Sequence, residues 1–341
     1  MADTEATLQP SVSVVIPVYN SEDYLLVALQ SALLQDLRDI EIICVDDGST
    51  DRSRLIIEEL AEVDDRLKLV TQKRGGAGAA RNAGIDAARG AFIAFLDADD
   101  WYEKPSYLRT LFEGARATGQ SVAAGCFVNW RGVDDVERSF ADTVFDGYEY
   151  TTSGVVDWRD FQFDYGFHRF LFARELFSGG RNRFGSLTYY EDPVFLVRIL
   201  DEAGTFFATD QAHYMYRCEY KPRDWTTGNV LDLLEGVGAN LGLAREKGLA
   251  KLQRYTVHHA DFGVREMGIG VNPALALDVI EEKLARVERL VDQGLLAQAG
   301  ESDLPFTLQL RKELDDWKCN RRFTMLKRRI RYKLDHRERT R

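Results

Sequence analysis

Three carboxylates at the end of one short apolar segment are the side chains in this sequence best suited to chemistry. Asp97, Asp99 and Asp100 directly follow Ala91–Leu96, a run typical of a buried β-strand. Mg²⁺ and Mn²⁺ take oxygen ligands, often one or two carboxylates together with phosphate oxygens and water. Because alternate residues of a strand point to opposite sides, Asp97 and Asp99 can hold different groups, a ribose and a metal. A solvated acidic turn that caps the next helix is the alternative interpretation.

A second acidic pair, Glu191 and Asp192, follows two tyrosines and opens a helical pattern with Pro193 in its first turn. A carboxylate among aromatic side chains tends to have a raised pKa, and such a group can act as a general base. A helix cap that interacts with the helix dipole is the local alternative. The residues alone leave both interpretations open.

A glycine-rich segment contains Gly76, Gly78 and Arg81 in a G-x-G-x-x-R string. The dinucleotide-binding fingerprint belongs after the first strand of a βαβ unit, and this string comes later in the chain, so we reject that interpretation. The glycines instead permit a tight entry into a helix and a close approach of the backbone to a ligand. Arg81 then lies one turn into this helix, where a guanidinium can pair with phosphate or carboxylate.

Cysteines and histidines show no metal-ligand pattern. The four cysteines lie far apart without a CxxC pair, so neither a zinc site nor a disulfide framework is indicated. His258 and His259 are adjacent on an expected helix and therefore face different directions. His168 and His213 stand alone in the sequence and carry no functional signal.

Strand and helix patterns alternate through the first 130 residues, which predicts crossover units and a largely parallel sheet. In such sheets ligands bind beyond the carboxyl ends of the strands. Polar clusters stand at three of these ends, at 17–20, 46–47 and 97–100, and we expect them to converge on one edge of the sheet. The expected strands are 11–17, 40–45, 67–71 and 91–96. Helical patterns are expected over 24–33, with Ser21 as the N-cap candidate, and over 51–62 and 79–89.

The pattern changes twice further along the chain. Residues 121–217 read as short strands and loops rich in Phe, Tyr and Trp, whereas helical patterns dominate after Asn229. We therefore expect an α/β domain over 1–225, with halves of about 11–120 and 121–225, and a helical region over 226–341.

Composition excludes several classes of protein. The 341 residues are 45% hydrophobic and 29% charged, which is ordinary for globular domains and excludes wholesale disorder. No apolar run approaches the roughly 20 residues of a membrane-spanning helix, and residues 1–10 lack the apolar segment of a secretory signal. We therefore expect a cytoplasmic protein. The net charge of −11 argues against general binding of nucleic acids.

The charge is unevenly distributed along the chain. Lys318–Arg341 contains eleven Lys or Arg residues and two acids, so this tail carries +9 and the rest of the chain −20. Apolar residues recur in the tail at helical spacing, which predicts a basic amphipathic helix. Such a helix can lie on the inner face of an anionic membrane, bind an anionic polymer, or pack on the acidic body of the protein itself.

Four segments together closely resemble the family 2 glycosyltransferases, which are inverting enzymes with the GT-A fold. They are VIPVYN at 15–20, VDDGSTD at 45–51, GAARN at 78–82 and FLDADD at 95–100, and YED at 190–192 resembles a later acidic motif of the family. The resemblance spans about 215 residues and leaves the helical C-terminal third unmatched. It implies a GT-A domain over 1–225 whose first half binds the nucleotide-sugar and whose second half binds the acceptor.

The resemblance implies a role for each motif in binding a UDP-sugar. Pro17, Val18 and Tyr19 are expected to line the nucleoside pocket, with the Tyr19 ring stacked on the base. Asp47 is expected to accept a hydrogen bond from the uracil N–H, and Arg81 to help position the donor.

The acidic motifs are expected to supply the chemistry. Asp97 and Ala98 contact the ribose or the donor sugar, and Asp99 binds the Mn²⁺ or Mg²⁺ that neutralises the leaving diphosphate. Asp192 deprotonates the acceptor hydroxyl for a single displacement at the anomeric carbon. The expected activity is thus that of a metal-dependent glycosyltransferase of the hexosyltransferase class.

Further contacts are expected from charge and position. Arg217, Lys221 and Arg223 are candidates for a loop that closes over the diphosphate, and Glu191 is a candidate for a diphosphate or acceptor contact. The motif combination resembles bacterial transferases that build teichoic acids and capsules, so the expected acceptor is a polysaccharide, a teichoic-acid-like polymer or a lipid-linked glycan. The helical region over 226–341 is a candidate for acceptor binding or homo-oligomer formation, and the tail 318–341 for peripheral membrane contact.

Two other classes of function stay open from the sequence. A nucleotidyltransferase also uses a carboxylate pair on an α/β sheet, but its first strand is followed by a loop rich in glycine and basic residues, which Pro17–Asn20 lacks. A non-catalytic nucleotide-sugar-binding scaffold is expected to lose the metal carboxylate or the base, and this chain has both Asp99 and Asp192.

Overall fold

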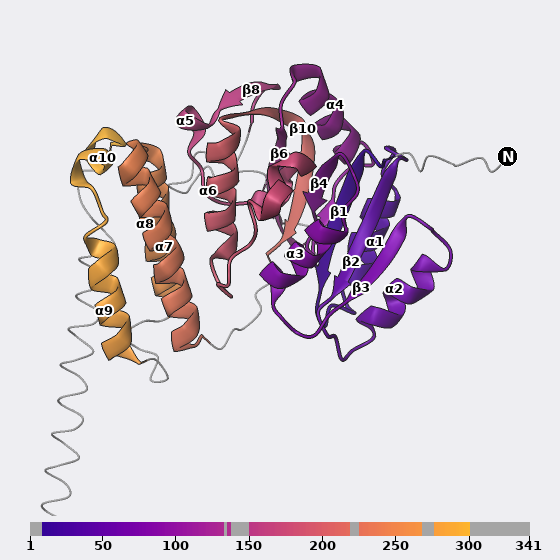
Figure 1. The fold of residues 1–341 in the computed structure, drawn as a ribbon, viewed down its shortest axis with the longest axis horizontal. Coiled ribbons are helices and arrows are strands. Elements are labelled where there is room, and N and C mark those ends of the chain that lie inside the picture. The colour runs from indigo at the N-terminus through magenta and orange to yellow at the C-terminus, as the bar shows by residue number, and fades with distance from the viewer. Residues whose placement is uncertain (1–8, 133–134, 138–149, 219–224, 268–275, 301–341) are drawn as a thin grey trace, which may run out of the picture. The chain divides into compact units, whose positions relative to one another are not determined.

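The computed structural model describes residues 9–132, 135–137, 150–218, 225–267 and 276–300. The chain divides into two compact units, 1–222 and 223–341 (Figure 1). The predicted candidates Lys221 and Arg223, and the basic tail at 318–341, lie outside the described residues.

The described strands of the first unit form one mixed sheet, in the order β3-β2-β1-β4-β9-β6-β10-β5, with β7 paired to β6 and β8 paired to β10. Parallel pairing joins β3, β2, β1 and β4, and it also joins β6 to β10. The predicted α/β class with a largely parallel sheet is confirmed. The strands are β1 Val12–Val18, β2 Ile40–Asp46, β3 Leu67–Thr71, β4 Phe92–Phe95, β5 Trp101–Tyr102, β6 Val122–Gly132, β7 Asp135–Glu137, β8 Gly154–Asp157, β9 Phe170–Ala173 and β10 Thr205–Arg217.

Burial explains why the central strands read as continuous apolar runs. Every residue of β2 is buried, and so is every residue of β1 except Pro17, because other parts of the chain cover both faces of a central strand. β9 is also wholly apolar, yet it runs antiparallel between β4 and β6. An apolar run identifies a buried strand but gives no signal of its direction, so the sequence did not predict this insertion.

Helices pack on both the early and the late strands of this sheet. α3 packs on β1 and β2, α2 on β3, and α4 on β6 and β10. α1 begins at Leu25 and its N-cap is Tyr24 rather than the predicted Ser21, whose hydroxyl donates to the carbonyl of Tyr19. The helices of this unit are α1 Leu25–Leu33, α2 Ser53–Ala61, α3 Ala77–Ala87, α4 Tyr107–Thr118, α5 Trp158–Phe161 and α6 Glu191–Ala203, with short 3₁₀ turns η1 Phe167–Arg169 and η2 Arg174–Gly180.

The second unit is helical throughout its described residues. α7 begins with a capping box between Thr226 and Asn229 and ends at Gly248, which is in the left-handed conformation. It packs against α8 and α9, and α8 also packs against α10. These helices are α7 Thr227–Lys247, α8 Ala250–Glu266, α9 Leu277–Glu288 and α10 Gln293–Gln298.

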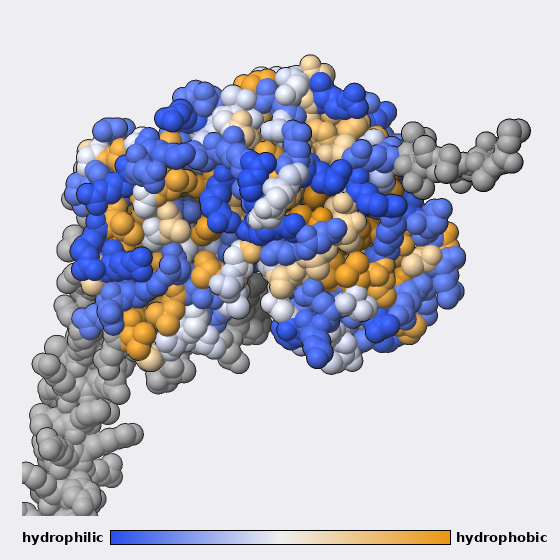
Figure 2. All heavy atoms as spheres, viewed as in Figure 1, coloured by the Kyte–Doolittle hydropathy of each residue, from blue (hydrophilic) through white to orange (hydrophobic). Residues whose placement is uncertain are grey.

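The surface in view is mainly hydrophilic, with apolar residues in small groups (Figure 2). Exposed apolar side chains of the first unit include Leu26 and Val27 on α1 and Leu55 on α2. Small dispersed groups of this kind are normal for a folded domain. These apolar groups do not indicate a functional site, and the candidate site described below lies at the carboxyl ends of β1, β2 and β4.

The contact between α3 and β1 leaves no room for a side chain at Gly84. A Cβ atom at this position would lie 2.2 Å from Cγ1 of the fully buried Val15. Gly84→Ala is therefore expected to push α3 away from the sheet and lower the free energy of unfolding by about 1–3 kcal/mol. Chemical denaturation measures this change. Gly154→Ala is the control, since an added Cβ there meets no atom within 4 Å, and we expect a change within about 0.5 kcal/mol.

Candidate active site

The predicted convergence of the strand ends is observed at the carboxyl edge of β1, β2 and β4. The backbone N–H of Asp47 donates to the carbonyl of Val18 at 2.8 Å, which ties the end of β2 to the end of β1. Leu96 N–H donates to Val15 O at 3.0 Å and continues the pairing of β4 with β1. The loops that carry the first, second and fourth motifs therefore leave the sheet side by side.

Asp47 organises the loop that leads into α3. Its Oδ1 accepts hydrogen bonds from Gln72 Nε2 and Gly75 N, both at 2.7 Å, and its Oδ2 accepts one from Gly76 N at 2.8 Å. Gly76 has a φ of 89°, a conformation that favours glycine, so this residue turns the chain into the helix. The sequence predicted the tight entry but not the carboxylate that holds it.

The predicted nucleoside-pocket residues differ in exposure. The Val18 side chain is only 1% exposed and belongs to the core, whereas the Tyr19 ring is 38% exposed at the edge of the sheet. Pro17, which precedes both residues, is half-buried. The guanidinium of Arg74 lies over the Tyr19 ring, 3.1 Å from its centroid. Arg74 precedes the glycines anchored by Asp47, and no motif in the sequence identified it.

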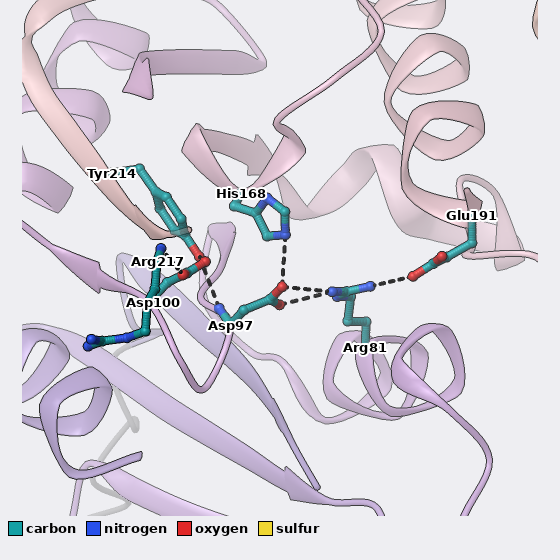
Figure 3. Close-up of polar contacts among 7 residues, drawn as sticks. All are labelled: Arg81, Asp97, Asp100, His168, Glu191, Tyr214 and Arg217. Carbon is teal, nitrogen blue, oxygen red and sulfur yellow. Dashed lines mark hydrogen bonds and ion pairs between the residues drawn. The ribbon is translucent and has the colours of Figure 1, made fainter. Parts of the chain in front are cut away.

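Arg81 joins two acidic motifs from one turn inside α3 (Figure 3). Its Nη2 donates to both oxygens of Asp97, at 2.9 and 3.2 Å, and its Nη1 donates to Glu191 Oε1 at 2.9 Å. The Arg81 side chain is only 6% exposed, and its guanidinium lies over the rings of Phe167 and Phe184. The expectation that Arg81 pairs with an anionic group is met here by two carboxylates of the chain itself.

The neighbouring Asn82 explains the rest of this motif. Its Nδ2 donates to the carbonyl of Phe184 at 2.9 Å, and its Oδ1 accepts from the Phe184 N–H at 3.0 Å. A side-chain amide that pairs with both backbone groups of one residue fixes that segment against α3. Asn82 therefore holds the chain that leads to Glu191, while Arg81 holds Glu191 itself.

His168 also contacts the Asp97 carboxylate, although no sequence motif includes this histidine (Figure 3). Its Nε2 lies 2.9 Å from Asp97 Oδ2, and its side chain is 7% exposed. Burial raises the pKa of Asp97, but Arg81 and His168 outweigh burial, so the pKa lies well below its usual range. Asp97 is therefore an anchored anion. The signal that would have identified His168 is its distance from Asp97, which sequence spacing does not reveal.

Asp192, at the start of α6, has a pKa shifted in the opposite direction from that of Asp97. Burial, together with the charge of Glu191, raises its pKa well above the usual range of an aspartate. This shift fits the predicted role of a general base, which works best when its pKa approaches the operating pH. The two carboxylates of the second acidic motif therefore differ. Glu191 pairs with Arg81, whereas the raised pKa of Asp192 favours its protonated form.

The turn after β4 is fixed by β10. Asp100 is 1% exposed; its Oδ2 accepts from the Tyr214 hydroxyl at 2.7 Å and its Oδ1 from the Arg217 N–H at 2.9 Å. The Tyr214 oxygen also accepts from the Asp97 N–H at 3.1 Å. Burial and the charge of Asp99 raise the pKa of Asp100 well above its usual range. Sequence reasoning singled out this acidic run but missed Tyr214 as the residue that shapes it.

Arg217 lies at the end of β10, not on a loop as we predicted from its charge. Its Nε donates to the Asp99 carbonyl at 2.9 Å, and its guanidinium lies over the rings of Tyr24, Trp101 and Trp130, 4.6–5.0 Å from their centroids. The pairing of β10 with β6 extends to Arg217 itself, which is why this residue belongs to the strand. Its position beside Asp99 still brings it to the edge where the motifs converge.

The predicted metal site depends on Asp99, a half-buried carboxylate at the same edge. Within the described parts of the chain, no three His, Cys, Asp or Glu side chains are grouped to hold a metal ion. One carboxylate supplies a hard oxygen ligand of the kind that Mg²⁺ and Mn²⁺ prefer, and those ions commonly take their remaining ligands from substrate phosphates and water. The donor set fits such a shared site. Ala98, between the two aspartates, is 5% exposed.

Comparison with known proteins identifies the family of the first unit. A family model described as Glycosyl transferase family 2 matches residues 13–179. Among curated relatives, the putative glycosyltransferase EpsH of Bacillus subtilis (strain 168) is 49% identical over 106 residues, which is 31% of this chain and 30% of the relative. The uncharacterized glycosyltransferase EpsJ of the same strain is 32% identical over 214 residues, 61% of each chain. The chain thus spans less than two thirds of these relatives.

A solved structure shows the same fold. The crystal structure of an S. aureus TarS fragment in complex with UDP-GlcNAc superposes with a TM-score of 0.65 at 19% identity and covers 84% of this chain and 82% of that one. Residues 13–179 therefore form a family 2 glycosyl transferase domain on a GT-A fold, as the motifs predicted. In the described residues, we find no helix that is both long and apolar enough to span a membrane.

Arg81 is expected to be essential for the stability of this site. Arg81→Met removes the cation from two largely buried carboxylates, so we expect the free energy of unfolding at pH 7 to fall by about 3 kcal/mol. The folded-state pKa of Asp97 is depressed, so its contribution is present above the unfolded pKa of about 3.9 and is lost as the pH falls through the folded pKa. Urea unfolding should therefore show the largest difference in free energy between the two proteins at pH 7 and a progressively smaller one as the pH falls below about 4. A difference that is the same at all pH values would contradict the ion-pair assignment.

Proposed function

We propose that this family 2 glycosyl transferase domain moves a sugar from a UDP-sugar donor to a hydroxyl group of a cell-surface polymer or lipid-linked glycan, with inversion at the anomeric carbon. The observation that carries the proposal is the arrangement around Arg81, whose guanidinium binds Asp97 after β4 and Glu191 at the start of α6, where the next residue is Asp192. The pKa of Asp97 is lowered there and that of Asp192 is raised. Two acids whose environments separate their pKa values are typical of a site that divides binding from proton transfer.

The nucleotide would bind at the ends of β1 and β2. The Tyr19 ring offers an aromatic face for the uracil base, and that face now carries the Arg74 guanidinium at contact distance. A base stacked on this face takes the place of Arg74. Asp47 Oδ2 accepts a single hydrogen bond in the contacts described above, so it retains capacity for the uracil N–H. The UDP-GlcNAc held by the TarS fragment supports a donor of this class.

The reaction would be a single displacement. Asp192 accepts the proton of the acceptor hydroxyl, whose oxygen attacks the anomeric carbon as the bond to the UDP oxygen breaks. Asp97, anchored by Arg81 and His168, orients the donor by accepting from a hydroxyl of the ribose or sugar. A divalent cation held by Asp99 would supply positive charge to the leaving diphosphate. Arg217, whose side chain is fixed beside Asp99, would add a second cation there.

The acceptor class follows from the motifs and from charge. The motif combination resembles bacterial enzymes of surface polymers, and the tail at 318–341 is basic. Teichoic-acid-like polymers and lipid-linked glycans present anionic groups that such a tail can bind, and they are met at the cytoplasmic face of the membrane.

Release of UDP by the purified chain against a panel of UDP-sugars tests the proposal before an acceptor is known. We expect slow hydrolysis of one donor with Mn²⁺ or Mg²⁺ and its loss with chelator. Asp99→Ala should abolish the metal-dependent rate, because Asp99 is the protein ligand we assign to the ion. UDP binding without turnover of any donor would indicate a scaffold instead. Turnover at the wild-type rate in Asp99→Ala would remove Asp99 as the ligand.

Asp192 should control the pH dependence of transfer. Because its pKa is raised, its deprotonated fraction grows above the usual aspartate range, and kcat/KM should rise with pH over that higher range. Asp192→Asn should lower kcat by about 100-fold to 10,000-fold and leave UDP affinity within about threefold. Steady-state kinetics and titration calorimetry measure both. Asp86→Asn, at the exposed end of α3, is the matched control and should leave the profile intact. Near wild-type transfer by Asp192→Asn would show that another group is the base.

A further inference from the structure

His168 reaches Asp97 from a distant part of the chain. Asp97 follows β4, while His168 lies in η1 just before β9, 71 residues later. The contact therefore joins the nucleotide-sugar half of the unit to the half expected to bind the acceptor. No motif of the sequence accounts for it, and the mechanism above uses His168 only as an anchor of Asp97.

Aromatic side chains fix the plane of the His168 ring. Its centroid lies 3.9 Å from that of Phe167 and 5.4 Å from that of Tyr214, whose plane is inclined by 29°. Phe127 lies beyond, at 6.4 Å. Tyr214 is itself held by the Asp97 N–H and by Asp100. The imidazole thus has little freedom to rotate, and its Nε2 is directed at Asp97 Oδ2 (Figure 3).

Hydrogen bonding assigns the tautomer of this ring. The Asp97 carboxylate is paired with Arg81 and can only accept, so the hydrogen is on Nε2 of His168. Nδ1 is buried and has no hydrogen-bond partner among the described residues. A hydrogen on that nitrogen would be a buried donor without an acceptor, which is unfavourable. The geometry therefore fits the tautomer that donates once, to Asp97.

The two oxygens of Asp97 are consequently unequal. Oδ2 accepts from His168 Nε2 and from Arg81 Nη2, whereas Oδ1 accepts from Arg81 Nη2 alone. A carboxylate oxygen has two lone pairs, so Oδ2 is filled and Oδ1 keeps one acceptor position. The side chain of Asp97 is 21% exposed, which lets this position meet a ligand.

We propose that His168 is a positioning residue that selects Asp97 Oδ1 as the oxygen that accepts a hydroxyl of the donor sugar, and that it thereby sets donor specificity. This inference rests on the function proposed above. A single acceptor position in a fixed direction favours sugars whose hydroxyl points toward it. Without His168, Oδ2 gains an acceptor position and the carboxylate is held by Arg81 alone. Hydroxyls of other orientation can then be accommodated.

Three substitutions at one position separate this role from a structural one. The side-chain nitrogen of Gln in His168→Gln can occupy the place of Nε2, whereas that of Asn in His168→Asn corresponds to Nδ1 and falls short of Asp97. His168→Leu removes the donor altogether. For each protein, kcat/KM for UDP release is measured with the preferred UDP-sugar and with its epimers. We expect the ratio between donors to fall about tenfold in the Leu and Asn variants and to stay within about threefold of wild type in the Gln variant.

The controls use the same proteins. UDP affinity, measured by calorimetry, should not change in any variant, since the proposed contact is to the donor sugar, which UDP lacks. A merely structural role would lower the free energy of unfolding of the Leu and Asn variants and leave the donor ratio unchanged, which would overturn the inference. The inference is also overturned if the ratio of kcat/KM between donors falls as much in His168→Gln as in His168→Leu.

Failure of the proposed function gives a different result. A wild-type chain that binds UDP and turns over no donor overturns the function, and the specificity role of His168 with it. The underlying geometry has a separate measurement, the ¹⁵N spectrum of the His168 imidazole in the ligand-free chain. Hydrogen on Nε2 and none on Nδ1 is the expected result, and hydrogen on Nδ1 would overturn the assignment of the contact.

Discussion

One buried cation organises this site. The Arg81 guanidinium binds Asp97 with one nitrogen and Glu191 with another, and the three residues come from α3, the end of β4 and the start of α6. Removing an arginine from water has a high free-energy cost, which its two carboxylates must offset. In return, the arginine favours the charged form of Asp97 and lowers its pKa. A single side chain therefore joins three elements of the fold.

As an electrostatic consequence, acids that lie close together have different pKa values. Arg81 and His168 stabilise the charged form of Asp97, whereas burial and the charge of the neighbouring Glu191 raise the pKa of Asp192. Asp100, buried against Tyr214, is a third case, in which a carboxyl group shapes a turn. Aspartates with the same intrinsic chemistry thus acquire different roles from burial and from the sign of the nearest charge.

Local patterns in the sequence predicted the parts of the fold that local forces determine. The first four strands, the helix that carries Arg81 and the convergence of the motifs follow from apolar periodicity, glycine and the parallel geometry of crossover units. The sequence patterns missed His168, Arg74 and Tyr214. Each of these residues contacts a partner that is distant in the sequence, and local spacing does not indicate such a contact. The direction of β9 was missed for the same reason, since a strand takes its direction from its neighbours.

Asp47 has implications for how such a site can change over evolutionary time. Its carboxylate holds the backbone of Gly75 and Gly76, directly before the helix that presents Arg81. In the proposed function Asp47 also accepts a hydrogen bond from the uracil base. A substitution that altered this preference would then loosen the start of that helix and, through it, the ion pairs of Arg81 with Asp97 and Glu191. Under this proposal, preference for the base and placement of these acids would be inherited together, and a lineage that acquired a different nucleotide would first need another support for the loop.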